Sequence, residues 1–313
     1  MKGERRVRKN AGITMLAKQM KRFPVFGLMV LAASVALGAS RAEETRLTLR
    51  QEFLRLINSD RKAHGLRPVE LDSWTSSLAD EYCRAQLRNG TTGHFTTDGQ
   101  APYMRYSFAG GSDGVSENAA AWSASYRFSD RALYEMIRRS EEAMMSESAP
   151  HDGHRRTILD PNATHVGIGL AWSGGEFRLT QEFIRRYISW TARPPHAAMT
   201  SDRIVAAGRA AHGYVVDAIS VHYEPMPQPI SPITANMIET YSLPDRRRDY
   251  ALHGQSGFNF AVPFTDGPGI YTIVVWVKKA DDREAIPATN VSIRVDRPSN
   301  SEPILLSGGG GMR

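Results

Sequence analysis

Two histidines and two glutamates carry most of the chemistry that this sequence offers, and they lie in three short polar stretches. The stretch Ser146 to Asn162, SESAPHDGHRRTILDPN, contains Glu147 and His154. Upstream, GHFTTDG contains His94 and VSENAAAW contains Glu117. Imidazole and carboxylate groups suit a divalent cation such as zinc, and they also suit general acid–base catalysis. Spacing along the chain does not show that the four side chains meet.

The elements that would position these residues begin with three predicted helices. Residues 47–64 place apolar side chains on one helical face. A second helix is predicted to begin after Asp72 and to end at Gly90, and a third to begin after Ser129 or Asp130. The polar stretches therefore fall between and after the helices.

Residues 91–128 are rich in Gly, Ser and Thr, and they are predicted to form long loops with short ordered pieces. Residues 165–172 and 176–188 alternate in polarity like two antiparallel strands, joined by a Ser-Gly-Gly turn. Helices followed by a late hairpin predict an α+β domain in which the helices pack on a small antiparallel sheet.

The pattern changes after a Pro-containing connector at residues 191–202. Short β-type runs follow, separated by turns rich in Pro, Gly and Asp, at residues 213–224, 258–264, 269–279 and 290–296. This spacing predicts a β-sandwich. We therefore expect a first domain over residues 43–192, a smaller all-β, sandwich-like domain over residues 200–298, and a flexible tail at residues 299–313.

The basic residues of the chain are concentrated at its start. Residues 1–42 contain nine Lys or Arg and one acidic residue, a net charge of +8, and the remainder has 30 basic and 32 acidic residues. The body of the protein thus has no electrostatic reason to bind nucleic acid.

The basic start is followed by an apolar run at residues 23–40, and Ser40 and Ala42 fit the −3 and −1 positions of a signal-peptidase site. We expect a signal peptide, residues 1–42, and an exported protein that is periplasmic or extracellular; an uncleaved anchor is the alternative. No later segment is apolar for 18 residues, so no membrane span is expected in the mature protein. The single cysteine, Cys83, excludes an internal disulfide and is expected to be buried.

Five motifs in order resemble the CAP superfamily, which comprises the cysteine-rich secretory, antigen 5 and pathogenesis-related proteins with an SCP domain, in its bacterial form. They are LINSDRKAHGLRPVELD, GHFTTDGQAPYMR, SENAA, GHRRTILDPNATHVGIGLAW and LTQEF, within residues 48–188. SENAA departs from the family's Gly-Glu-Asn motif by having Ser116 in place of glycine. The resemblance implies a CAP-type α-β-α sandwich, which agrees with the predicted α+β class.

The resemblance also implies a cavity in which two histidines and two glutamates hold a divalent metal. By position in the motifs these are His94, Glu117, Glu147 and His154. Glu147 is assigned because MMSE resembles the family's Trp-Tyr-Ser-Glu segment; Glu141 and Glu142 are the alternatives. His151 is expected at the surface. An open site of this kind would bind a metal such as zinc only weakly.

The sequence gives no catalytic residues. It has no His-Glu-x-x-His motif, and we interpret GGSDG, residues 110–114, as a flexible loop and not as a serine-hydrolase turn. The favoured function is a secreted binding protein for an extracytoplasmic lipid, small molecule or protein, with a cell-envelope component among the candidates. The alternatives are a metal-dependent hydrolase and a structural envelope protein.

Overall fold

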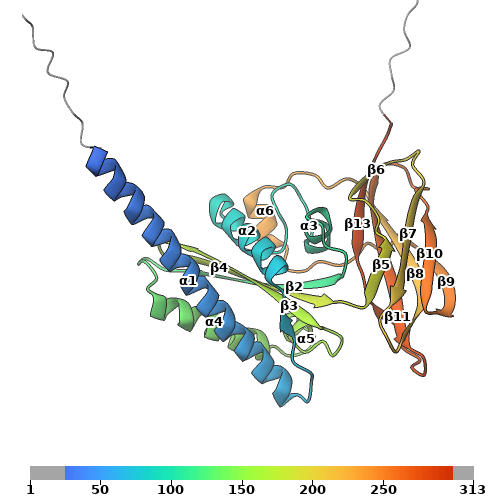
Figure 1. The fold of residues 1–313 in the computed structure, drawn as a ribbon, viewed down its shortest axis with the longest axis horizontal. Coiled ribbons are helices and arrows are strands. Elements are labelled where there is room, and N and C mark those ends of the chain that lie inside the picture. Colours follow the sequence, from blue (N-terminus) through green and yellow to red (C-terminus); the bar gives the residue numbers. More distant parts are fainter. Residues whose placement is uncertain (1–24, 299–313) are drawn as a thin grey trace, which may run out of the picture. The chain divides into compact units, whose positions relative to one another are not determined.

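The computed structural model describes residues 25–298 (Figure 1). By its contacts the chain divides into two units, residues 1–45 and 46–313, and helix α1, Val25–Ala63, passes from one to the other. Residues 1–24 of the predicted signal peptide and the predicted tail lie outside the described residues.

A four-stranded sheet forms the centre of the first part of the second unit. Its strands are β1 (Glu70–Leu71), β2 (Gly114–Ser123), β3 (His165–Ser173) and β4 (Glu176–Arg185). They lie in the order β1-β3-β4-β2, with β4 antiparallel to both β3 and β2. The predicted hairpin is thus confirmed as β3 and β4, and β2 forms one edge of the sheet.

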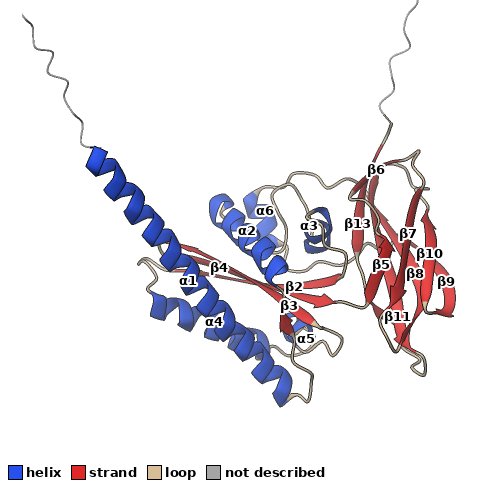
Figure 2. Ribbon diagram, in the orientation of Figure 1, coloured by secondary structure: helices blue, strands red, loops and turns tan. Residues whose placement is uncertain are grey.

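Helices cover both faces of this sheet, which confirms the predicted α-β-α sandwich (Figure 2). The further helices are α2 (Ser73–Asn89), α3 (Pro102–Phe108), α4 (Asp130–Met145) and α5 (Gly153–Ile158). Apolar side chains of α1, α4 and α5 share one buried cluster with β3 and β4, while α2 contacts the same strands from the other face. The Asp72 carboxylate caps α2, as predicted, and Ser129, one of the two predicted positions, caps α4.

The glycines of the VGIGL motif alternate with apolar residues because the two faces of β3 pack against different helices. Val166, Ile168 and Leu170 are fully buried against the α1 and α4 side. Gly167 and Gly169 face α2, where a Cβ built on Gly169 would lie 2.4 Å from the backbone carbon of Ala79. Only glycine lets the helix approach the strand this closely.

Residues 91–128, predicted as long loops with short ordered pieces, contain two such pieces, α3 and β2. The strand β2 pairs with β4 along its whole length, from Gly114 opposite Arg185 to Ser123 opposite Glu176. Its sequence contains three consecutive alanines, which have low β propensity and hide the alternation of its two faces. Long-range pairing with β4, which is invisible in a local pattern, makes this segment a strand.

The second part of the unit consists of two further sheets. One has the order β10-β7-β5, and the other has β6-β13-β11-β8-β9 with β12 beside β11. Their strands are β5 (Ile188–Ala192), β6 (Ala197–Met199), β7 (Ile204–Ala210), β8 (Tyr214–Glu224), β9 (Arg247–Gln255), β10 (Gly257–Val262), β11 (Gly269–Lys279), β12 (Ile286–Pro287) and β13 (Val291–Asp296). Side chains from both sheets share one apolar cluster, as expected for a β-sandwich.

The predicted limit of the first domain at residue 192 is too late. Strand β5 pairs with β7, and the Ile188 side chain belongs to the core of the sandwich. The sandwich therefore begins directly after β4. The Pro-containing connector at residues 191–202 includes strand β6, which pairs with β13.

The sandwich and the first part share a third apolar cluster. Tyr103 and Met104 of α3 are packed there with Ile184 of β4 and Ile270 of β11. A backbone hydrogen bond of 2.8 Å joins the Gly114 N–H to the carbonyl of Ala288. Contacts of this kind unite the described residues from 46 onward into one compact unit.

A truncated protein of residues 43–196 is therefore expected to lose cooperative unfolding. It would expose the apolar faces of Tyr103, Met104 and Ile184, each worth about 1.5–3 kcal/mol when buried, against a total stability of about 5–15 kcal/mol. Thermal and urea unfolding, followed by circular dichroism, should show a broad transition for residues 43–196 and a sharp one for residues 43–298. A sharp transition in both would show that the shared cluster is dispensable.

Candidate functional site

The four predicted site residues come together at the β2 edge of the central sheet. Glu117 lies on β2, His94 on the loop between α2 and α3, and His154 in the first turn of α5. The two imidazole rings are 6.4 Å apart between centroids, with an interplanar angle of 32°. Glu147 lies on the loop before α5. The arrangement is two histidine–glutamate pairs that lie side by side.

The first pair is buried. His94 Nδ1 lies 2.9 Å from Glu117 Oε1, and only 6% of His94 is exposed. An ionised carboxylate can only accept hydrogen bonds, so Nδ1 of His94 carries the hydrogen and Nε2 keeps its lone pair. Burial, reinforced by the charge of Arg105, lowers the pKa of His94 to about 4. The ring is therefore neutral at ordinary pH.

The second pair is more open. His154 Nδ1 lies 2.5 Å from Glu147 Oε1, and the side chains of His154 and Glu147 are 34% and 23% exposed. The other oxygen, Glu147 Oε2, accepts the backbone N–H of His154 at 2.9 Å and that of Arg155 at 3.3 Å. Glu147 thus binds the free amides at the start of α5 and also orients the His154 ring.

Arg105 organises the first pair, and it was not among the predicted site residues. Its guanidinium donates to Glu117 Oε2, to Glu182 Oε1 at 3.3 Å and to the carbonyl of His94 at 2.8 Å. It also stacks on Tyr82, with its central carbon 3.6 Å from the ring centroid. The arginine that trails His94 in the first histidine motif was the available signal, although nothing local showed its partners.

Glu182 was also missed, and it lies opposite Glu117 in the register of β2 and β4. Burial and the neighbouring charge of Glu117 raise the pKa of Glu182 well above its usual range. The Glu182 carboxyl is thus held toward its protonated form, while Arg105 balances the negative charge of Glu117. The signal in the sequence was the glutamate in the strand motif LTQEF.

A second series of side-chain hydrogen bonds lies on the other face of β2. Asn118 Nδ2 donates to the carbonyl of His154 at 3.1 Å and to Gln181 Oε1 at 2.9 Å. Gln181 Nε2 in turn donates to Glu141 Oε2 at 2.8 Å. Glu141 is therefore a buried partner of Gln181 and not a member of the two histidine–glutamate pairs. Glu142 is exposed and paired with Arg138.

The donor chemistry fits a divalent cation held by two imidazoles. Because both Nδ1 atoms are bound to glutamates, the two Nε2 lone pairs remain for a ligand, as in carboxylate–histidine–zinc arrangements. Among the described residues, no group of three or more His, Cys, Asp or Glu side chains is arranged to hold a metal ion. The four-residue metal site thus stays a prediction, and the geometry gives the two glutamates the role of orienting the histidines.

Three other residues singled out from the sequence are not members of the two pairs. His151 is exposed, as expected. Cys83 is fully buried beside Thr180, and burial raises the pKa of its thiol to about 12. Ser112 of the GGSDG loop lies between α3 and β2, and its carbonyl accepts a hydrogen bond from Trp190. A nucleophilic serine of the Gly-x-Ser-x-Gly type would follow a strand and precede a helix.

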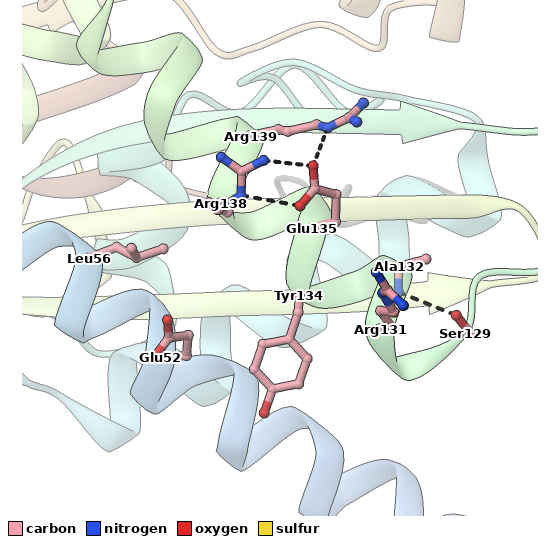
Figure 3. Close-up of a pocket in the computed structure, with 9 residues that line it drawn as sticks. All are labelled: Glu52, Leu56, Ser129, Arg131, Ala132, Tyr134, Glu135, Arg138 and Arg139. Carbon is pink, nitrogen blue, oxygen red and sulfur yellow. Dashed lines mark hydrogen bonds and ion pairs between the residues drawn. The ribbon is translucent and has the colours of Figure 1, made fainter.

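A surface groove of about 650 Å³ lies between α1 and α4 (Figure 3). It is lined by Glu52, Leu56, Ser129, Arg131, Ala132, Tyr134, Glu135, Arg138 and Arg139. Glu135 pairs with Arg138 and Arg139 at helical spacings of three and four residues. Such exposed pairs are ordinary features of a helix surface, and the groove contains none of the four predicted site residues.

The buried Glu141 gives a pH-dependent stability that can be measured. Burial, with the charge of Asp60 nearby, raises the pKa of Glu141 from 4.5 to about 8. Between these values the unfolded chain loses the proton while the folded chain keeps it, so stability falls as pH rises through this window. Glu141→Gln should remove this loss, which amounts to at most about 1.4 kcal/mol for each pH unit.

The measurement is urea unfolding between pH 5 and pH 8.5 for the wild type, Glu141→Gln and the exposed control Glu142→Gln. The control should keep the pH dependence of the wild type. A Glu141→Gln curve parallel to that of the wild type would show that Glu141 is ionised in the folded protein.

Comparisons with known proteins identify the first part of the unit. Residues 54–183 match the "Cysteine-rich secretory protein family", CAP. Over 134 residues the chain is 27% identical to "Uncharacterized protein YkwD" of Bacillus subtilis (strain 168), a match that covers 43% of this chain and 46%, or about half, of that relative. A crystal structure of an extracellular protein containing a SCP domain from Bacillus anthracis str. Ames shows 20% identity and a TM-score of 0.34, covering 44% of this chain and 40% of that one. Residues 54–183 are therefore a CAP domain.

Proposed function

We propose that this chain is an exported binding protein that holds a divalent cation, such as zinc, between His94 and His154. The observation that carries the proposal is the shared arrangement of the two histidines. Each presents Nδ1 to a glutamate, at 2.9 Å for His94 and 2.5 Å for His154, and each keeps Nε2 for a ligand. A glutamate on Nδ1 fixes the tautomer and makes the imidazole a better ligand.

The extracytoplasmic ligand would complete the coordination of the cation. Two imidazoles leave positions open, and a lipid, a small molecule or a protein with an oxygen donor could fill them. An open shell binds metal more weakly than a closed structural zinc site, so the cation is expected to exchange. A cell-envelope component is the favoured class of ligand because the leader predicts export.

Export rests on the leader of residues 1–42, and the structural relative from Bacillus anthracis is described as extracellular. No helix in residues 25–298 is long and apolar enough to cross a membrane. Expression in a Gram-negative host should yield a protein whose first residue is Glu43, as determined by N-terminal sequencing. An intact leader would support the uncleaved anchor instead.

Zinc titration tests the cation site. In isothermal titration calorimetry, His94→Ala and His154→Ala should abolish zinc binding to metal-free protein, because each removes one of the two ligands. His151→Ala is the matched control, since His151 is an exposed histidine from the same loop, and it should bind like the wild type. Glu147→Gln should weaken binding by about 10–100-fold, as expected for a residue that orients a ligand.

The outcomes separate the candidate functions. If all variants bind zinc alike, the two pairs form no cation site. If His151→Ala alone loses binding, the ligand in the loop has been assigned wrongly. Cleavage of peptide, ester or glycan substrates by the zinc-loaded protein, lost in His154→Ala, would favour the hydrolase over the binding protein.

A further inference from the structure

The connection between β8 and β9 reaches from the sandwich to the candidate site. We call residues 225–246 the strap. It contains five prolines and one short helix, α6 (Pro232–Met237). Proline restricts the backbone, so a strap of this composition has fewer conformations than an ordinary loop of its length.

The strap is fastened to the loop that carries His94. The Ile230 N–H donates to the carbonyl of Thr97 at 2.9 Å. The Asn236 side chain accepts the N–H of Thr92 at 2.8 Å and donates to the carbonyl of Gly90 at 3.0 Å. These contacts hold the loop on both sides of His94.

Tyr241 of the strap contacts both members of the first pair. Its ring lies edge-on to the His94 ring, with centroids 4.9 Å apart and an interplanar angle of 62°. Its hydroxyl oxygen accepts the backbone N–H of Glu117 at 2.5 Å. Because that bond uses the oxygen as acceptor, the hydroxyl hydrogen of Tyr241 is directed elsewhere.

As a result, the two histidines differ in their exposure to solvent. His94, beneath Tyr241, is 6% exposed, whereas the side chain of His154 is 34% exposed. The strap also packs Met226 and Leu243 with Tyr241 against the apolar cluster that joins the sandwich to α3. The cover over His94 is therefore fixed at several points.

We propose that Tyr241 is a specificity-determining residue of the candidate site, because it covers the His94 ring and leaves the His154 side as the entrance. A small ligand such as a cation reaches both rings, whereas an extended one, such as an acyl chain, cannot run past His94. The role in ligand choice rests on the binding function proposed above, but the cover itself is testable without any ligand.

The test is the rate at which diethyl pyrocarbonate modifies each histidine of the full chain, measured by peptide mass spectrometry. In the wild type, His94 should react at least tenfold more slowly than the exposed His151. Tyr241→Ala should raise the His94 rate at least tenfold. Tyr241→Phe should keep it slow, because the ring that covers His94 remains while the hydroxyl is lost. Ile233→Ala, at an exposed position on the same strap, is the control and should match the wild type.

Equal rates at His94 and His151 in the wild type would overturn the proposal, and so would an unchanged His94 rate in Tyr241→Ala. If Tyr241→Ala does not fold, Tyr241→Leu takes its place, and the wild-type ratio remains decisive. Zinc binding to the wild type is measured in parallel. Protection of His94 by Tyr241 without zinc binding would retain the cover and reject the cation function.

Discussion

The site depends on the burial of Arg105 between two carboxylates. A guanidinium taken out of water is costly unless its hydrogen bonds are used and its charge is balanced, and here Glu117, Glu182 and the His94 carbonyl meet that need. The same guanidinium fixes Glu117, which orients the His94 ring, and it also holds the loop that carries His94. Removal of this one cation would leave a buried negative charge beneath the site, which typically costs about 3–5 kcal/mol.

Local patterns predicted those parts of the fold whose faces alternate clearly. Helices α2 and α4 have an N-cap and an apolar stripe, and the β3–β4 hairpin alternates around a glycine turn. The two faces of strand β2 do not differ clearly in polarity. The segment becomes a strand by pairing with β4, which lies about 60 residues later in the chain. The four predicted site residues were assigned through the family resemblance, because His94 and His154 are brought together only by the sheet edge and the loops around it.

The limit between the two parts was misjudged for a related reason. A change from helical to β periodicity marks where the pattern changes, but it does not show where contacts stop. Strand β5 completes the sandwich directly after the CAP sheet, and α3 packs against β11 across the limit. Arg105 lies on that same α3, so the helix that builds the shared cluster also supplies the central charge of the site.

The family match ends at residue 183, whereas the strap begins at residue 225. The residues by which a relative is identified are thus different from those that lie over His94. Two proteins with the same histidine and glutamate motifs can differ in which ligands reach the site if their C-terminal sequences differ. For this protein, a ligand established for a relative is therefore informative only when that relative also has a tyrosine-bearing strap, and comparisons within the family should be made over both segments.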